Sequence, residues 1–448
     1  MSSSHGHAPA HGLGELLRLA GPVILSRLGI MVMGLTDAIV VGRHSARELG
    51  YHALGWAPTM VVLTTAVGLL FGTQVLTARR VGEGRRDQAG AVLHRGLAYA
   101  LLLGIGSGAL LFLAGPSLLH SVRLEEDLAD GASRALQVFA LSLPTYLVAV
   151  ACSLFLEALS KATPSMIFMW LANGVNLALN LLFVPGEFGV PGGAVGSAWA
   201  TFGARTALML MLLVYILTMP EARALGVFRR FPRDPAAAHE QRKIGFGAGA
   251  SYFVEVAAFA GMSVVAGWLG GLAVAAWTVV LNVSAIVFMG PLGLGTATAV
   301  LVGRAYGARD GRGVVRAGFL GLAAAAVLTL VIALVVWPGA GFIAGLYATD
   351  PALVTLAASG LVLATLFFVA DGLQVVAANA LRARGDVWVP TAMHVTSYAV
   401  VMLPLGWALA HPVGLGLNGI VWSVIIASLV SAGFLCGRFA WLARRPLR

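Results

Sequence analysis

Charged residues are scarce in this chain. Asp, Glu, Lys and Arg make up 11% of its 448 residues, whereas a soluble globular protein carries about 25%. Hydrophobic residues make up 59% of the chain, and the mean hydropathy is +0.88. A soluble domain could not hide that much apolar surface from water, so the composition predicts an integral membrane protein.

Cysteine is nearly absent too. Cys152 and Cys436 are the only two, and both lie in apolar stretches, which excludes a disulfide framework and a cysteine metal cluster. The polar start MSSSHGHAPAHG is not followed by a short apolar core and a cleavage site, so no removable signal peptide is expected. Basic loops such as RRVGEGRRD lack the Lys-Ser/Thr of a phosphate-binding loop. We therefore expect no nucleotide and no cofactor beyond a coupling ion.

Long apolar runs fill the rest of the chain. Each is roughly 20 to 28 residues long, enough for a helix to cross a bilayer, and the pattern predicts twelve spans. They lie near 16–40, 53–78, 91–114, 135–158, 164–184, 193–218, 244–269, 273–302, 314–337, 353–381, 388–410 and 416–438.

The net charge of +10 indicates membrane orientation rather than nucleic-acid binding, because the basic residues sit in short loops between the spans. If the N-terminus is inside, the outer loops hold only Arg43, Arg47, Arg123 and Arg134. All the other loop arginines and lysines then face the cytoplasm. The prediction is a protein of the inner membrane with both termini cytoplasmic.

The polar segment 219–243 divides the chain into similar halves. We expect lobes at 16–218 and 244–440, a flexible N-terminus at 1–15 and a tail at 441–448. Several residue pairs are 223 positions apart: Gly72-Thr73 with Gly295-Thr296, Gly84 with Gly307, Asp87 with Asp310, Gly196 with Gly419, and Trp199 with Trp422. Six spans per half make the repeat parallel, which predicts two pseudo-symmetric six-helix lobes around a central cleft, rocking to give alternating access.

Two acidic residues lie deep inside spans of the second half. Glu255 is about eleven residues from Lys243, or about 16 Å along a helix, and Asp371 is placed similarly in 353–381. Acids at this depth are costly and mark ion pathways. The two carboxylates could share a pocket in which one holds a proton, or they could share Na⁺ as a metal site. Alternatively, each is satisfied separately by neighbouring polar groups.

Polar residues of the first half suggest a second pocket. Asp37 lies near the outer end of the first span, and Thr201 lies in the sixth. In the fifth span Asn173, Asn176 and Asn180 share one helix face. These residues could line a polar pocket, or the amides could serve as hydrogen-bond partners between helices.

Other residues within spans leave alternatives open. Arg27 should pair with an acid or face water, while His394 could relay protons or, more simply, pack as a hydrogen-bonded side chain.

Prolines interrupt long spans at Pro22, Pro144, Pro291 and Pro404, where each permits a bend or a static kink. Methionines such as Met169 and Met262 could line a binding site or merely pack.

These motifs together resemble the multidrug and toxic compound extrusion (MATE) family, most closely its NorM-type branch. The resemblance rests on GLTDAIVVGR, NGVNLALNLLFVPGEFGVPGGAVGSAWAT, NVSAIVFMGPLGLGTATAVLVGRAYGARD and the Glu255 and Asp371 spans. It implies a twelve-helix, two-lobe exporter that exchanges drugs and organic cations for Na⁺ or H⁺.

The resemblance also implies roles for single residues. Glu255 and Asp371 match the family's second-lobe cation site, and Pro22 matches a first-helix proline linked to bending. The first-lobe polar site is matched by Asp37, Asn176, Asn180 and Thr201. Two departures concern the coupling ion: Phe367 stands where some relatives have tyrosine, and Arg27 stands where relatives often have a neutral amide.

The leading hypothesis is therefore a monomeric antiporter, not an enzyme, whose partners are amphipathic cationic molecules, Na⁺ or H⁺ and the lipid bilayer. One alternative is a lipid-linked oligosaccharide flippase of the same superfamily, which would need many basic residues in its cleft. Another is a membrane scaffold or receptor without transport. The substrate range, the choice between Na⁺ and H⁺, and the stoichiometry stay open.

Overall fold

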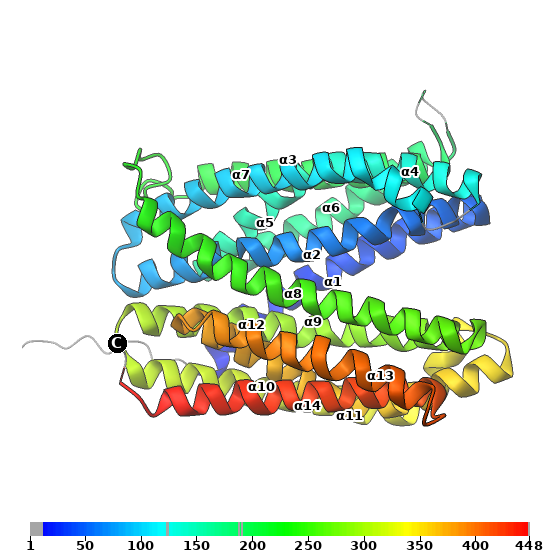
Figure 1. The fold of residues 1–448 in the computed structure, drawn as a ribbon. Coiled ribbons are helices and arrows are strands. Elements are labelled where there is room, and N and C mark those ends of the chain that lie inside the picture. Colours follow the sequence, from blue (N-terminus) through cyan, green and yellow to red (C-terminus); the bar gives the residue numbers. More distant parts are fainter. Residues whose placement is uncertain (1–11, 122–124, 187–188, 190, 447–448) are drawn as a thin grey trace, which may run out of the picture. The chain divides into compact units, whose positions relative to one another are not determined.

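The computed structural model describes residues 12–121, 125–186, 189 and 191–446, and nearly all of them are helical (Figure 1). Most of the predicted N-terminus (1–15), part of the tail (441–448) and Arg123 lie outside the described residues. The helices are α1 Leu13–His44, α2 Ala46–Gly82, α3 Ala89–Ser121, α4 Glu126–Leu141, α5 Leu143–Ala158, α6 Ala162–Phe183, α7 Gly193–Thr218, α8 Pro235–Leu269, α9 Gly271–Gly307, α10 Gly311–Tyr347, α11 Pro351–Arg384, α12 Trp388–His394, α13 Leu403–Ala410 and α14 Gly416–Ala443. A short 3₁₀ turn, η1 Arg86–Gln88, precedes α3, and a π-helical segment, η2 Val395–Met402, joins α12 to α13.

The predicted set of apolar spans is confirmed within the described residues. Eleven helical segments are long and apolar enough to cross a bilayer, and the pair α4 and α5, bent by 43°, supplies a twelfth if counted as one span. The break has a local cause. Pro144 lies in the first turn of α5 and has no N–H to donate to the carbonyl of Ala140. This span begins earlier than the sequence indicated, at Glu126 rather than near residue 135.

A second proline shapes the eleventh span. Pro404 has no N–H for the carbonyl of Val400, and the chain immediately before it forms η2 instead of a regular α-helix. Such π-helical segments widen the turn and redirect side chains, and they are frequent at functional sites. The interruption predicted at Pro404 is therefore visible as a change in helix type.

The helices form two compact units. The N-unit contains Leu25–Thr77 and Arg85–Phe259, and the C-unit contains the described parts of Met1–Ile24, Ala78–Gly84 and Ala260–Arg448. The boundaries between the units fall inside α1, α2 and α8. The lobes expected at 16–218 and 244–440 stay a prediction, since they rest on the sequence repeat rather than on these contacts.

Only the first part of the expected linker is irregular. Turns follow α7 up to residue 228, and α8 already begins at Pro235. Asp234 caps this helix, because its Oδ1 accepts a hydrogen bond from the Ala237 N–H at 2.9 Å. An acid followed by proline is a helix-start signal, so residues 235–243 are the first turns of a span.

Within the N-unit, Lys161 anchors the turns that follow α7 through a 2.8 Å ion pair with Glu221. This ion pair lowers the pKa of the exposed Glu221 carboxyl.

Each unit has a characteristic packing arrangement. In the N-unit α3 packs on α4 and α5, and α6 pairs with α7. In the C-unit α11 packs against α9, α10 and α14, so α11 is the central helix of that unit (Figure 1). The candidate acid Asp371 is therefore carried by a helix that contacts three others in the C-unit.

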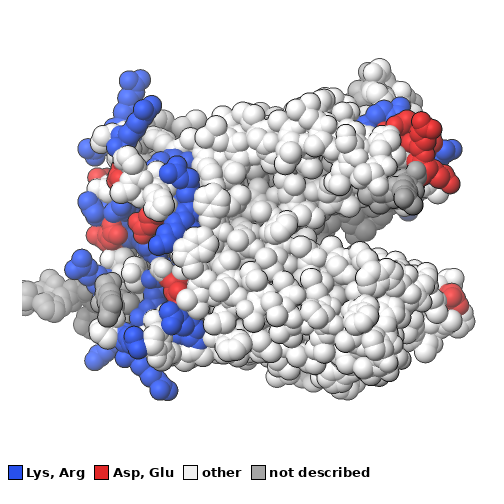
Figure 2. Space-filling view, in the orientation of Figure 1, with Lys and Arg blue, Asp and Glu red and all other residues white. Residues whose placement is uncertain are grey.

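Basic side chains gather at one end of the helices in both units (Figure 2). This is the distribution that the loop charges predict for a membrane protein. The bias supports the assignment of one end of the spans to the cytoplasm, while the cytoplasmic location of the termini stays a prediction.

The contact between α3 and α5 depends on a glycine. A Cβ atom added at Gly104 would lie 2.4 Å from the Cα of Pro144, and backbone atoms cannot move aside as a flexible side chain can. We predict that Gly104→Ala lowers the free energy of unfolding by about 1–3 kcal/mol through overpacking. Unfolding measured in mixed detergent micelles tests this.

The same helix offers a matched control. Gly106 has no heavy atom within 4 Å of an added Cβ, so Gly106→Ala should leave stability unchanged or raise it slightly through helix propensity. Equal destabilisation by both substitutions would contradict the packing explanation.

Candidate functional site

A buried carboxylate joins three helices in the N-unit. Asp37, on α1, is 3% exposed, and its Oδ1 accepts hydrogen bonds from Asn176 Nδ2 at 2.9 Å and Asn180 Nδ2 at 2.7 Å. Its Oδ2 accepts a hydrogen bond from Thr201 Oγ1 at 2.6 Å. The structure thus brings together all four residues that the sequence proposed for the first-lobe polar site.

Helical spacing explains this arrangement. Asn176 and Asn180 are four residues apart on α6 and so project from one face, which points toward Asp37 on α1 and Thr201 on α7. Asn173 lies on the same face but behaves differently: its Nδ2 donates to the backbone carbonyls of Gly29 and Met169. All three amides therefore form hydrogen bonds between α6 and α1: Asn173 to a backbone carbonyl, and Asn176 and Asn180 to the carboxylate of Asp37.

A small cavity opens beside Asp37. It has a volume of about 20 Å³ and is lined by Ile30, Met33, Gly34, Asp37, Trp56, Tyr146, Met169, Thr201, Arg205 and Leu208. That space is enough for about one water molecule. Met169 is thus one of the methionines that line a cavity, as the sequence suggested for some of them.

Arg205 brings a positive charge into the wall of this cavity. The side chain is 4% exposed, and its Nη1 donates to Ser142 Oγ at 2.7 Å. The guanidinium lies over the rings of Tyr146 and Trp56, 4.6 and 5.2 Å from their centroids. Among the described residues no carboxylate lies within 4.0 Å of it, and its Nε has no hydrogen-bond partner. The faces of Tyr146 and Trp56 therefore stabilise the Arg205 cation. The spacing of these residues in the sequence did not indicate this contact.

The second arginine of these spans is neutralised by an acid. Arg27 Nη2 lies 3.3 Å from Glu157 Oε1, and Gln74 Nε2 donates to Glu157 Oε2 at 3.1 Å. Arg27 is 11% exposed and Glu157 is 2% exposed. The expectation that Arg27 pairs with an acid is confirmed, and the amide of Gln74 completes the coordination of that carboxylate.

We predict that Arg27→Met costs about 3–5 kcal/mol of stability, because it leaves the Glu157 carboxylate buried without its counter-charge. The double variant Arg27→Met/Glu157→Gln should recover most of that loss, since no buried charge remains. Unfolding in mixed micelles would measure both. A double variant as unstable as the single one would show that packing, rather than charge, explains the effect.

The candidate acid of the C-unit is Asp371. It is 9% exposed on α11, and its Oδ1 accepts a hydrogen bond from Gln374 Nε2 at 3.2 Å. Tyr398, fully buried in η2, also interacts with this carboxyl. The π-helical segment thus contributes directly to the surroundings of the acid.

A glycine next to Asp371 lets the helices approach closely. A Cβ atom at Gly372 would lie 2.8 Å from Thr329 Cγ2 and 3.3 Å from Pro291 Cγ. These residues belong to α10 and α9, so the acid lies where three helices of the C-unit meet. Phe367, one turn earlier, is 3% exposed and packs edge-on against Phe368, so it supplies no oxygen ligand there.

His394 corrects one expectation. It is 1% exposed at the end of α12 and lies edge-on to Tyr398, with ring centroids 5.8 Å apart. Neither ring nitrogen has a hydrogen-bond partner among the described residues. The packing role is therefore confirmed, while the hydrogen bond expected with it is not found among the described residues, because the ring is buried against an aromatic face. A role in proton relay stays a prediction.

Glu255 lies on α8 and is 8% exposed. It belongs to the N-unit, whereas Asp371 belongs to the C-unit, so their sharing of one site stays a prediction from the sequence. Within the described residues no group of three or more His, Cys, Asp or Glu side chains could hold a metal ion. A Na⁺ site built from these two carboxylates and neutral oxygens therefore remains a hypothesis, as does the bending role of Pro22.

The apolar spans and the buried polar clusters define a multi-pass α-helical membrane transporter. The MatE family model matches residues 22–182 and 248–408, so the chain belongs to the MatE family. The two matched segments have equal length and fall one in each half, as the internal repeat predicts.

Named relatives cover almost the whole chain. It is 58% identical over 429 residues to "Probable multidrug resistance protein NorM" of Caulobacter vibrioides, covering 96% of this chain and 91% of the relative. It is 32% identical to "Multidrug resistance protein PmpM" of Pseudomonas aeruginosa, covering 97% and 93%. The eukaryotic MATE transporter AtDTX14 has the same fold, with a TM-score of 0.87 at 17% identity over 97% of this chain and 98% of that one.

Proposed function

We propose that this protein is a secondary active transporter that exports several amphipathic organic cations in exchange for Na⁺ or H⁺. The observation that carries the proposal is the 58% identity, over 96% of the chain, to a relative named as a probable multidrug resistance protein. The buried Asp37 carboxylate supports it, because an acid held deep in a membrane span by neutral partners is typical of an ion or substrate pathway.

Transport of this kind needs a bistable protein. Coupling arises when the ion and the substrate bind with different affinity to two conformations. In this scheme the ion binds Glu255 and Asp371 from outside and stabilises one conformation. The organic cation stabilises the conformation that releases it to the outside. The protein works as a monomer in the inner membrane, with both termini in the cytoplasm.

The arginines buried within the spans give little support to the flippase alternative. A carrier of lipid-linked sugars would need several uncompensated cations within its spans to hold pyrophosphate. Of the two arginines that the sequence placed deep in spans, Arg27 is paired with Glu157 and Arg205 is held against Tyr146 and Trp56. One guanidinium that has no carboxylate partner, and that already contacts aromatic rings and a hydroxyl, is too little for that substrate.

We predict that Glu255→Gln and Asp371→Asn each reduce ion-driven efflux to the level of vesicles without the protein, because each removes a charge that the coupling ion must bind. Dye efflux from proteoliposomes, normalised to folded protein, measures this. The control is Glu125→Gln, which neutralises an exposed carboxylate outside the helices and should leave efflux unchanged. Full activity of Glu255→Gln would contradict the coupling scheme.

The coupling ion can be determined in the same vesicles. A pH gradient and a Na⁺ gradient are imposed separately, and the gradient that drives dye efflux identifies the ion. Because Phe367 offers no oxygen beside Asp371, we expect the pH gradient to be the more effective, since a proton needs fewer ligands than Na⁺. Efflux driven by Na⁺ alone would contradict this expectation.

A further inference from the structure

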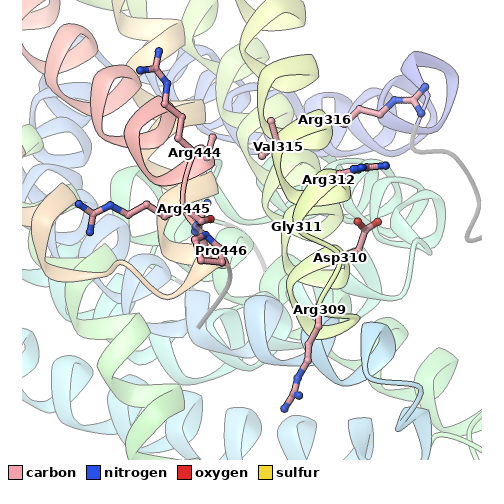
Figure 3. A pocket seen from close by; sticks show the side chains of 11 residues that line it. Arg309, Asp310, Gly311, Arg312, Val315, Arg316, Arg444, Arg445 and Pro446 are labelled. Atoms are coloured by element: carbon pink, nitrogen blue, oxygen red, sulfur yellow. Dashed lines mark hydrogen bonds between the residues drawn. The ribbon is translucent and has the colours of Figure 1, made fainter.

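A basic groove opens at one end of the C-unit, between the start of α10, the end of α11 and the chain that follows α14. Its volume is about 590 Å³, within the usual range for small-molecule sites. The lining residues, which define the basic groove, are Arg309, Asp310, Gly311, Arg312, Val315, Arg316, Arg384, Ala443, Arg444, Arg445 and Pro446. Figure 3 shows Arg312 and Arg316 on one wall and Arg444 and Arg445 on the other, with their side chains fanning outward.

The groove is strongly positive and its charge is not compensated. It holds six arginines and a single acid, Asp310. The Oδ1 of Asp310 already accepts a hydrogen bond from the Gly313 N–H at 2.9 Å, as the cap of α10. Among the described residues no carboxylate lies within 4.0 Å of the guanidinium groups of Arg312, Arg316 or Arg444. An anionic ligand would therefore meet free donors on both walls.

One of the six arginines is buried. Arg384, in the last turn of α11, is 9% exposed, and its Nη2 donates to the carbonyl of Arg445 at 3.4 Å. That bond holds the end of the chain beside α11. In the part of the chain that the structure describes, no carboxylate lies within 4.0 Å of Arg384, although Asp386 acts on it from further away. The groove therefore has a positive, partly desolvated base beneath its surface arginines.

Apolar side chains continue the walls of the groove along the helices. Trp441 is 43% exposed in α14 and is covered by Arg445, 3.5 Å from the ring centroid, and by Arg438 at 4.7 Å. Phe319 is 44% exposed on α10, one turn beyond the groove residue Val315. Tryptophan beside arginine is typical of the level where a span meets the lipid headgroups.

We propose that the basic groove binds the headgroup of an anionic phospholipid from the leaflet that faces the basic ends of the spans. The arginines on the two walls bind the phosphate oxygens, and the acyl chains run along the exposed apolar surface near Phe319 and Trp441. Basic pockets between membrane helices on the cytoplasmic side bind such headgroups. A soluble anion would gain nothing from the apolar continuation. Because the arginines of the two walls point to different sides in Figure 3, they favour a headgroup with two separate phosphates.

The test uses the purified full-length protein in neutral detergent, titrated with phosphatidylcholine, phosphatidylglycerol or cardiolipin of matched acyl chains. Native mass spectrometry counts the bound lipids, and the thermal midpoint reports stabilisation. We expect cardiolipin to bind more tightly than phosphatidylglycerol, and phosphatidylcholine not to bind. The triple variant Arg312→Gln/Arg316→Gln/Arg444→Gln should weaken cardiolipin binding by about tenfold or more.

The matched control is Arg223→Gln/Arg230→Gln/Arg233→Gln, which removes three arginines from the segment before α8 in the N-unit and should keep the affinity. Equal weakening in both triple variants would overturn the proposal, because it would indicate general surface attraction. Equal stabilisation by soluble pyrophosphate would also overturn it in favour of a soluble anion. If the groove triple variant does not fold, Arg312→Gln and Arg444→Gln are compared singly with Arg230→Gln.

Discussion

The bilayer interior offers no water to a buried charge, so each ionised side chain must find its partners within the protein. Four such groups in the N-unit meet this demand by different means. Asp37 accepts hydrogen bonds from two amides and a hydroxyl, and Glu157 takes a guanidinium and an amide. Arg205 uses aromatic faces and one hydroxyl. The positions of α1, α2, α5, α6 and α7 relative to one another are tied to these contacts.

The same constraint distinguishes charged groups that only stabilise the fold from acids that are candidates for binding a transported ion. The Arg27–Glu157 pair leaves no charge for a further ligand, because each partner neutralises the other and Gln74 supplies a further donor. Asp37 has only neutral partners and borders a cavity, so it can exchange a neighbour for a ligand without first breaking an ion pair. Asp371 likewise has neutral neighbours, Gln374 and Tyr398. These two acids are therefore better suited to binding a moving cation than Glu157 is.

Prolines and glycines place the acids as much as polar residues do. Pro404 directly follows η2, the π-helical segment that carries Tyr398, and Gly372 lets α11 approach α9 and α10. The sequence revealed the prolines, since a ring without an N–H must interrupt the hydrogen-bond ladder. It did not reveal the π-helical geometry, because a break can equally produce a kink, as at Pro144.

The sequence by itself determined the membrane class, the set of spans and the common helix face of Asn176 and Asn180, because hydropathy and helical spacing are local properties. The grouping of these amides with Asp37 and Thr201 was implied by the family resemblance, and the structure brings the four side chains together. The start of the fourth span at Glu126, and the start of α8 inside the expected linker, depended on where short polar turns end, which periodicity locates poorly. Only the tertiary structure decided that Arg27 meets Glu157, 130 residues away, and that Arg205 rests on Trp56 and Tyr146. Such partners lie on different helices, and the order of residues along one chain does not specify which helix faces will meet.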